Sequence, residues 1–387
     1  MMYDFDKIVE RENTSSIKYD MRMQMFGKED ITPLWVADMD FETPDFVREA
    51  IVKRAQHPIY GYSLRGETYT NSIIDWVERK HDWKINEDWI VFSPGIVPAL
   101  NFATLALTKP GDAILVQPPV YFPFFTAATD HDRILTESTL IYKHGGYTID
   151  FDDFAAKAKY AKLFFFSSPH NPTGRVWTRE ELVQIASICL DNDVIIVSDE
   201  IHNDLIFPNK KHIPIATISD EIADITITCI APSKTFNLAG MATSSLIISN
   251  HNLREKMQTI IDSLHISLGN VFGAIASEAA YTHGYDWVIA LMEYVSGNLD
   301  VLRSTLISTN SRIKLVEPEA TYMAWLDFND TGYDDDKIKN IIINEAKLGL
   351  SHGPIFGVGG SGFQRINLAS PRTIVSSASD RLCKVFK

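Results

Sequence analysis

Short, continuously apolar runs alternate with longer stretches of helical periodicity between about residues 45 and 290. Six of these runs have the length and composition of buried strands: WIVFS (89–93), AILVQ (113–117), LFFFSS (163–168), VIIVSDE (194–200), ITITCI (225–230) and SSLIIS (244–249). Between them, stretches such as 45–56 and 178–192 carry apolar residues at helical spacing. Apolar strands separated by helices predict a mostly parallel sheet covered by helices on both faces.

The last hundred residues follow a different pattern. We expect a long helix near 285–309, then the apolar runs RIKLVE, YMAWLDF and FQRINLA, with helices at 333–347 and 371–386. This pattern predicts a smaller α+β domain. The N-terminal stretch ITPLWVADMDF has no regular period, and we expect it to cross between the two domains.

Composition narrows the class of protein. The chain has 387 residues and a formal net charge of -14, which argues against nucleic-acid binding because nothing offsets phosphate repulsion. No apolar run approaches the roughly 20 residues of a membrane span, and the N-terminus lacks the layout of a signal peptide. The three cysteines, Cys189, Cys229 and Cys383, are too sparse for a disulfide framework and indicate a reducing compartment. We therefore expect a cytoplasmic protein without a membrane or nucleic-acid partner.

Polar side chains follow three of the predicted strands. Asn171 lies in NPTG, Asp199 and His202 lie in SDEIH, and Lys234 lies in a short turn, APSKTFNLAG, between two apolar strands. Ligands bind at the carboxyl ends of parallel strands. A buried lysine is costly unless it is paired, neutralised or used covalently.

The same stretch could be taken for a metal site. Asp199, Glu200, His202 and Asp204 all carry groups that bind metals. Adjacent strand residues point to opposite faces of a sheet, however, and no second group of ligands is evident. We therefore expect no metal here.

The order NPTG, SDEIH, SKTFNLAG resembles pyridoxal-phosphate enzymes of the aspartate-aminotransferase fold over nearly the whole chain. Together with PLWVADMDF and YGYS, it looks most like the MalY/PatB-type cystathionine β-lyases. The resemblance implies the type I PLP-dependent transferase fold. That α/β fold has a large domain with a mostly parallel seven-stranded sheet flanked by helices, and a small α+β domain. We place the large, PLP-binding domain at 48–287 and the small domain with the N-terminal segment at 1–47 and 288–387.

The resemblance also assigns roles around the cofactor, pyridoxal 5'-phosphate. Lys234 would bind the cofactor aldehyde covalently and move the substrate α-proton, and Asp199 would keep the pyridine nitrogen protonated. Asn171 would donate to the phenolic oxygen. His202 stands where many relatives carry a tyrosine with that role. Tyr121 matches the aromatic residue that stacks on the cofactor ring.

The phosphate of the cofactor would lie at a helix N-terminus. Backbone N–H groups of Gly95, Ile96 and Val97 would bind it, and Ser233 would add a hydroxyl. Ala242 stands where many aminotransferases carry an arginine or lysine. The phosphate would therefore rest more on dipoles and hydroxyls than on fixed charge.

The remaining implied roles concern the substrate and a second subunit. Arg365 would hold the substrate α-carboxylate, with Ala37, Asn171 and Tyr121 also in contact with substrate. Tyr62 of YGYS matches a tyrosine that reaches the cofactor phosphate of the neighbouring subunit, which implies a homodimer with shared active sites. Tyr60 is the rival for this role.

The implied activity is β-elimination from L-cystathionine or a related cysteine S-conjugate, giving a thiol, pyruvate and ammonia. An aminotransferase of class I or II is the alternative within the same fold. A regulatory protein that binds the cofactor without turnover is the alternative from another class, although intact Lys234, Asp199, Asn171 and Arg365 argue against it. The sequence leaves open the preferred thioether and any second role.

Overall fold

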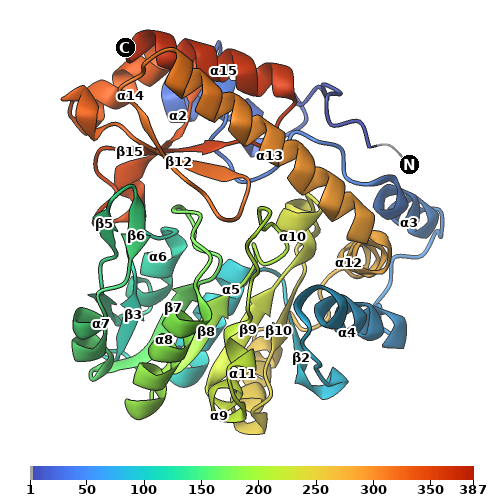
Figure 1. The fold of residues 1–387 in the computed structure, drawn as a ribbon. Helices are drawn as coiled ribbons and strands as arrows, with labels where there is room; N and C mark the ends of the chain where they lie inside the picture. The colour runs from blue at the N-terminus through green and yellow to red at the C-terminus, as the bar shows by residue number, and fades with distance from the viewer. Residues whose placement is uncertain (1–2) are drawn as a thin grey trace.

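The computed structural model describes residues 3–387. A seven-stranded sheet lies at the centre of its larger part, and Figure 1 shows helices around it. Only β10 runs antiparallel to its neighbours, so the other six strands share one direction. This confirms the predicted fold class. In spatial order the strands are β2 (Ile90–Ser93), β10 (Ser244–Ile247), β9 (Thr226–Ile230), β8 (Ile195–Asp199), β7 (Ala161–Ser167), β3 (Ala113–Val116) and β4 (Ile134–Glu137).

The central strands place apolar residues on both faces because helices cover both faces of the sheet. In β7, Phe165 packs into one hydrophobic cluster, whereas its neighbours Phe164 and Phe166 pack into another on the opposite face. Val197 and Ile196 of β8 divide in the same way. The helices of this part are α3 (Asp45–Ala55), α4 (Glu67–His81), α5 (Ile96–Leu107), α6 (Pro123–Thr129), α7 (Phe151–Ala158), α8 (Arg179–Asp191), α9 (Asp220–Asp224), α10 (Pro232–Thr235), α11 (His251–Ser263) and α12 (Val271–His283).

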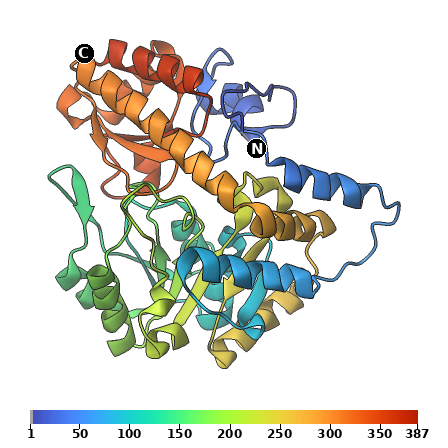
Figure 2. The same cartoon turned by 45° about the vertical axis from the view of Figure 1, so that its right-hand side comes forward.

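A smaller antiparallel sheet lies beyond the carboxyl ends of the large one. Its strands, in spatial order, are β11 (Lys314–Val316), β12 (Met323–Asp327), β15 (Phe363–Asn367) and β14 (Ser351–His352). The long helix α13 (Tyr285–Ser308) runs from beside α12 to this sheet, which is also accompanied by α14 (Asp335–Asn344) and α15 (Arg372–Val385) (Figures 1 and 2). A hairpin of β5 (Ile141–Lys143) and β6 (Gly146–Thr148) was not expected from the sequence.

The N-terminal segment packs with the C-terminal part of the chain (Figure 2). It holds two short helices, α1 (Ile17–Asp20) and α2 (Arg22–Phe26), and β1 (Thr32–Pro33), which pairs in parallel with β13 (Leu348–Gly349). Residues 34–41 then cross to the large part, where Asn237 accepts from the Met39 N–H at 3.0 Å. None of the helices in the described chain is long and apolar enough to cross a membrane.

Candidate active site

A cavity of about 150 Å³ opens where the carboxyl ends of the central strands meet the start of α5. It brings together ten of the residues that the sequence analysis selected. They are Ala37, Gly95, Ile96, Val97, Tyr121, Asn171, Asp199, His202, Ser233 and Lys234. Two selected residues are not in its lining: Arg365 lies next to Asn171, and Tyr62 is 98% exposed on the surface.

Lys234 lies directly after β9 in the short turn that the sequence suggested, and this turn forms the one-turn helix α10. Its Nζ donates to the Ala37 carbonyl at 2.7 Å. Burial and the positive charge of Arg365 lower the pKa of Lys234 to about 8, against the opposing effect of Asp38 and Asp199. Lys234 is therefore close to losing its proton near neutral pH, which a nucleophilic amine requires.

Asp199 ends β8 and is buried, with its Oδ1 accepting from the Ile201 N–H at 3.1 Å. Burial raises the pKa of this carboxyl to about 7, although that hydrogen bond and Lys234 oppose the shift. Asp199 therefore lacks a close cation that would fully stabilise its charge. His202 is also buried, which lowers its pKa to about 3 and keeps the ring neutral, and its Nδ1 has no hydrogen-bond partner.

Arg365 lies in the middle of β15 and is buried without an acidic partner among residues 3–387. Its Nη1 donates to Asn171 Oδ1 at 2.8 Å, and its Nη2 donates to the Trp35 carbonyl and to Ser351 Oγ, both at 3.2 Å. Its Nε is unpaired. Burial lowers the pKa of Arg365 to about 10. A buried guanidinium with a free N–H calls for an anion.

The first turn of α5 forms another side of the cavity. The N–H groups at a helix start have no partner within the helix, so those of Ile96 and Val97 are available to an anion. Thr243, just before β10, lines the same wall and its buried Oγ1 has no partner. Ser233 contributes a second hydroxyl-bearing side chain. This end of the cavity therefore offers only uncharged donors.

Comparison with known proteins decides the family. A sequence profile described as "Aminotransferase class I and II" matches residues 29–382. The chain belongs to this family. It is 40% identical over 366 residues to "Cystathionine beta-lyase PatB" of Bacillus subtilis (strain 168), covering 94% of this chain and 95% of that protein.

Solved structures of family members agree with the fold. The structure of cystalysin from Treponema denticola, which contains a pyridoxal 5'-phosphate cofactor, has a TM-score of 0.96 at 36% identity and covers 100% of this chain and 99% of that chain. The PLP-bound C–S lyase from Staphylococcus hominis has a TM-score of 0.92 at 32% identity, covering 100% and 98%. The type I PLP fold and pyridoxal 5'-phosphate as the cofactor are thereby established for this chain.

The cavity fits this cofactor. The cofactor carries an anionic phosphate, a basic ring nitrogen and an aldehyde. These match the donors at α5, the poorly stabilised carboxylate of Asp199 and the amine of Lys234. Unpaired polar atoms of Thr243 and His202 are left for it in the same cavity. Among residues 3–387, no cluster of three or more metal-binding side chains is found.

Two features of the site were missed by the sequence analysis. Thr243 follows directly on Ala242, the position where a basic residue was sought, and only its unpaired hydroxyl identifies it. The Trp35 carbonyl, which accepts from Arg365, is a backbone group and leaves no trace in residue type.

Proposed function

We propose that this protein is a carbon–sulfur β-lyase that cleaves L-cystathionine or a related cysteine S-conjugate to a thiol, pyruvate and ammonia. The observation that carries the proposal is the 40% identity to a cystathionine β-lyase along 94% of the chain. The cavity supports it, because Lys234, whose pKa burial lowers to about 8, lines the cavity with Asn171. Arg365, which has no acidic partner among residues 3–387, donates to Asn171.

Each side chain then has a defined task. When bound, pyridoxal 5'-phosphate supplies an electron sink for the electron pair left at the substrate α-carbon. Arg365 binds the α-carboxylate, and Asn171 and the Trp35 carbonyl hold the guanidinium in place. Lys234 would hold the cofactor through its aldehyde and, as a free amine, would remove the substrate α-proton.

The remaining steps concern the leaving group. The C–S bond breaks with its electron pair going to sulfur, which leaves as a thiolate and takes up a proton. Aminoacrylate is released and is hydrolysed to pyruvate and ammonia. Water is the only further reactant, so no keto acid is consumed.

The cofactor contacts are proposed from the same cavity. Asp199 would face the ring nitrogen, and Tyr121 would lie against the ring. The N–H groups at Gly95, Ile96 and Val97 would bind the phosphate, together with the hydroxyls of Ser233 and Thr243.

The lining also supports a substrate with an uncharged side chain. Among the described residues that line the cavity, Lys234 is the only lysine or arginine, and the His202 ring is neutral. A second carboxylate, as in aspartate or glutamate, would need a further cation. Tyr121, which lines the cavity, offers an aromatic ring instead.

The test is an assay of pyruvate and thiol release from a panel of cysteine conjugates. We expect L-cystathionine or an S-alkyl cysteine to give both products without any keto acid, and transamination with 2-oxoglutarate to be much slower. Borohydride reduction should fix the cofactor to the peptide that contains Lys234. Turnover that requires a keto-acid acceptor and releases no thiol would replace the lyase assignment with an aminotransferase, the second candidate of this family.

We further propose that the protein is a homodimer with shared active sites. The stretch between α3 and α4 exposes Ile59 by 66%, Tyr60 by 57%, Tyr62 by 98% and Leu64 by 90%. So many exposed large apolar side chains in one stretch favour an interface. The Tyr60 hydroxyl is engaged with the Ala55 carbonyl, which leaves Tyr62 as the better candidate to reach a neighbouring site.

A further inference from the structure

One stretch of irregular backbone, residues 35–40, contacts both groups that we assign to chemistry. We call it the bridging segment. Its Trp35 carbonyl accepts from Arg365 Nη2 at 3.2 Å, and its Ala37 carbonyl accepts from Lys234 Nζ at 2.7 Å. The position of this segment therefore sets where the guanidinium and the amine lie relative to each other.

Two asparagines anchor the bridging segment from opposite sides. Asn237, three residues after Lys234, accepts from the Met39 N–H at 3.0 Å and donates to the Met39 carbonyl at 3.1 Å. Asn367, two residues after Arg365, donates to the carbonyls of Val36 at 2.8 Å and Asp38 at 2.6 Å. The segment is thus bound to the turn of the lysine and to the strand of the arginine.

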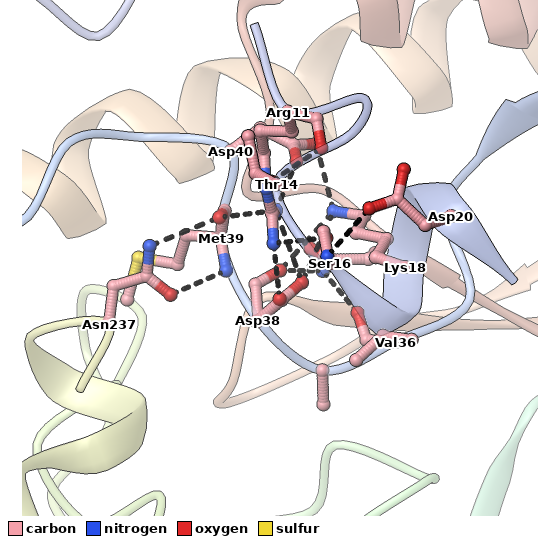
Figure 3. Close-up of polar contacts among 12 residues, drawn as sticks. Arg11, Thr14, Ser16, Lys18, Asp20, Val36, Asp38, Met39, Asp40 and Asn237 are labelled. Carbon is pink, nitrogen blue, oxygen red and sulfur yellow. Dashed lines mark hydrogen bonds and ion pairs between the residues drawn. The ribbon is translucent and has the colours of Figure 1, made fainter. Parts of the chain in front are cut away.

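The third anchor is a pair of basic residues from the N-terminal segment (Figure 3). Lys18 Nζ lies 2.8 Å from Asp40 Oδ2 and donates to the Asp38 carbonyl at 3.3 Å. Arg11 binds Asp38 Oδ2 at 2.6 Å and Asp40 Oδ1 at 2.7 Å through its two Nη atoms, and donates to the Met39 carbonyl at 3.0 Å. Two positive and two negative charges therefore close one network on the bridging segment.

The burial of this network indicates a role in geometry. Lys18 is 0% exposed and Asp40 is 4% exposed. Burial alone would raise the pKa of Asp40, but Lys18 and Arg11 hold it below its usual value, so the carboxylate stays charged. Buried ion pairs add little net stability because both charges lose their hydration. The ion pairs do, however, hold Asp38 and Asp40, and with them the backbone of the bridging segment, in one defined position.

We propose that Arg11 and Lys18 are positioning residues of the active site. They fix the bridging segment and, through its Trp35 and Ala37 carbonyls, orient Arg365 toward the substrate carboxylate and Lys234 toward the cofactor. The inference rests on the proposed function, since it takes the roles of Arg365 and Lys234 from there.

The test compares Lys18→Met and Arg11→Gln with the control Arg22→Gln. Arg22 belongs to the same N-terminal segment, pairs with Glu12 and donates to the carbonyls of Tyr19 and Ile31, none of which lies in the bridging segment. The first readout is the dissociation constant of L-alanine, an amino acid without a leaving group, whose binding is monitored through the absorbance of the bound cofactor. We expect this dissociation constant to rise about tenfold or more in Lys18→Met and Arg11→Gln, because misplaced groups bind the substrate poorly. In the control it should rise less than about twofold.

The second readout is amide hydrogen exchange in the cofactor-free protein. The N–H groups of Met39 and Asp40 are bonded to Asn237 Oδ1 and to the Ala369 carbonyl. We expect their exchange to accelerate about tenfold or more in Lys18→Met and Arg11→Gln, while Arg22→Gln leaves it unchanged.

The possible outcomes separate cleanly. Folded variants with unchanged L-alanine binding and unchanged exchange overturn the proposal, and so does a control that loses binding to the same degree. If Lys18→Met does not fold, Arg11→Gln decides, because the Arg11 side chain is 18% exposed and tolerates replacement better. A wild-type protein that binds no L-alanine refutes the proposed function, and exchange at Met39 and Asp40 then decides the inference alone.

Discussion

Asp199 is a buried carboxyl group with a single backbone hydrogen bond and no close cation. Its neighbour Glu200 is equally buried but accepts from His212 Nε2 at 2.7 Å and from Ser198 Oγ at 2.9 Å on the other side of the strand. Only Asp199 lines the cavity. Asp199, whose charge has no close cation among the described residues, is therefore the carboxylate that we propose as the partner of the cofactor ring nitrogen.

Replacing Asp199 with asparagine should keep the cofactor bound but lower kcat by about 100-fold or more. The neutral amide no longer holds the ring nitrogen protonated, so the electron sink is weaker. Steady-state kinetics together with the absorbance of the bound cofactor measure both effects. Glu200→Gln is the matched control and should affect stability more than kcat. Near-normal turnover of Asp199→Asn would remove Asp199 from this role.

At the scale of elements, the large sheet could be predicted from short apolar runs that alternate with stretches of helical periodicity. The runs at 163–168 and 194–200 correspond to β7 and β8, each apolar because it is covered on both faces. Local pattern could not predict the β5–β6 hairpin or the helical turn of Lys234, because each is only three or four residues long. Short elements depend on tertiary contacts that periodicity does not record.

Site residues could be predicted from the sequence where the side chain provides the functional group, but not where a backbone N–H or carbonyl provides it. Lys234, Asp199 and Asn171 could be selected because each is a polar residue placed after an apolar strand. The Trp35 carbonyl could not, since any residue supplies one. Thr243 lay between these cases, because a threonine beside a strand is ordinary until its hydroxyl proves to be buried and unpaired.

Thr243 gives a prediction for the elements around the phosphate. Thr243→Val should weaken cofactor binding about tenfold, because a hydrogen bond to a charged group contributes about 1.5–3 kcal/mol. The dissociation constant for pyridoxal 5'-phosphate, measured by absorbance or fluorescence, tests it. Thr228→Val is the control, since Thr228 also has a buried, unpaired Oγ1 but lies within β9 and outside the cavity lining. Equal losses in both variants would argue against a phosphate contact.

At the scale of the whole molecule, we propose that the exposed Tyr62 contacts the active site of a second subunit. Tyr62 is 98% exposed and does not line the cavity of its own chain. Mixing an inactive Lys234→Ala chain with an inactive Tyr62→Ala chain should therefore restore partial activity, because one site of the heterodimer has both residues intact. The oligomeric state of the protein and the exchange of subunits between the two variants should be measured independently of the activity assay.

The matched control for complementation is a Lys234→Ala chain mixed with an Asp199→Ala chain. Both residues line one cavity of the same chain, so no heterodimer contains an intact site and no activity should return. No recovery with the Tyr62 pair would mean that Tyr62 does not act across the interface, and recovery in this control would mean that the complementation does not report a shared site.

The parallel pairing of β1 with β13 has a consequence for how the protein is made. Thr32 of β1 pairs with Leu348 of β13, whereas all seven strands of the large sheet are translated well before residue 348. Contacts between residues so far apart in the sequence form late in folding, because the chain between them must first be brought together. On the ribosome, the nascent chain carries Lys234 long before Ser351 and Arg365 emerge. A polypeptide released early would therefore carry Lys234 without Arg365, the residue that we propose for the substrate carboxylate.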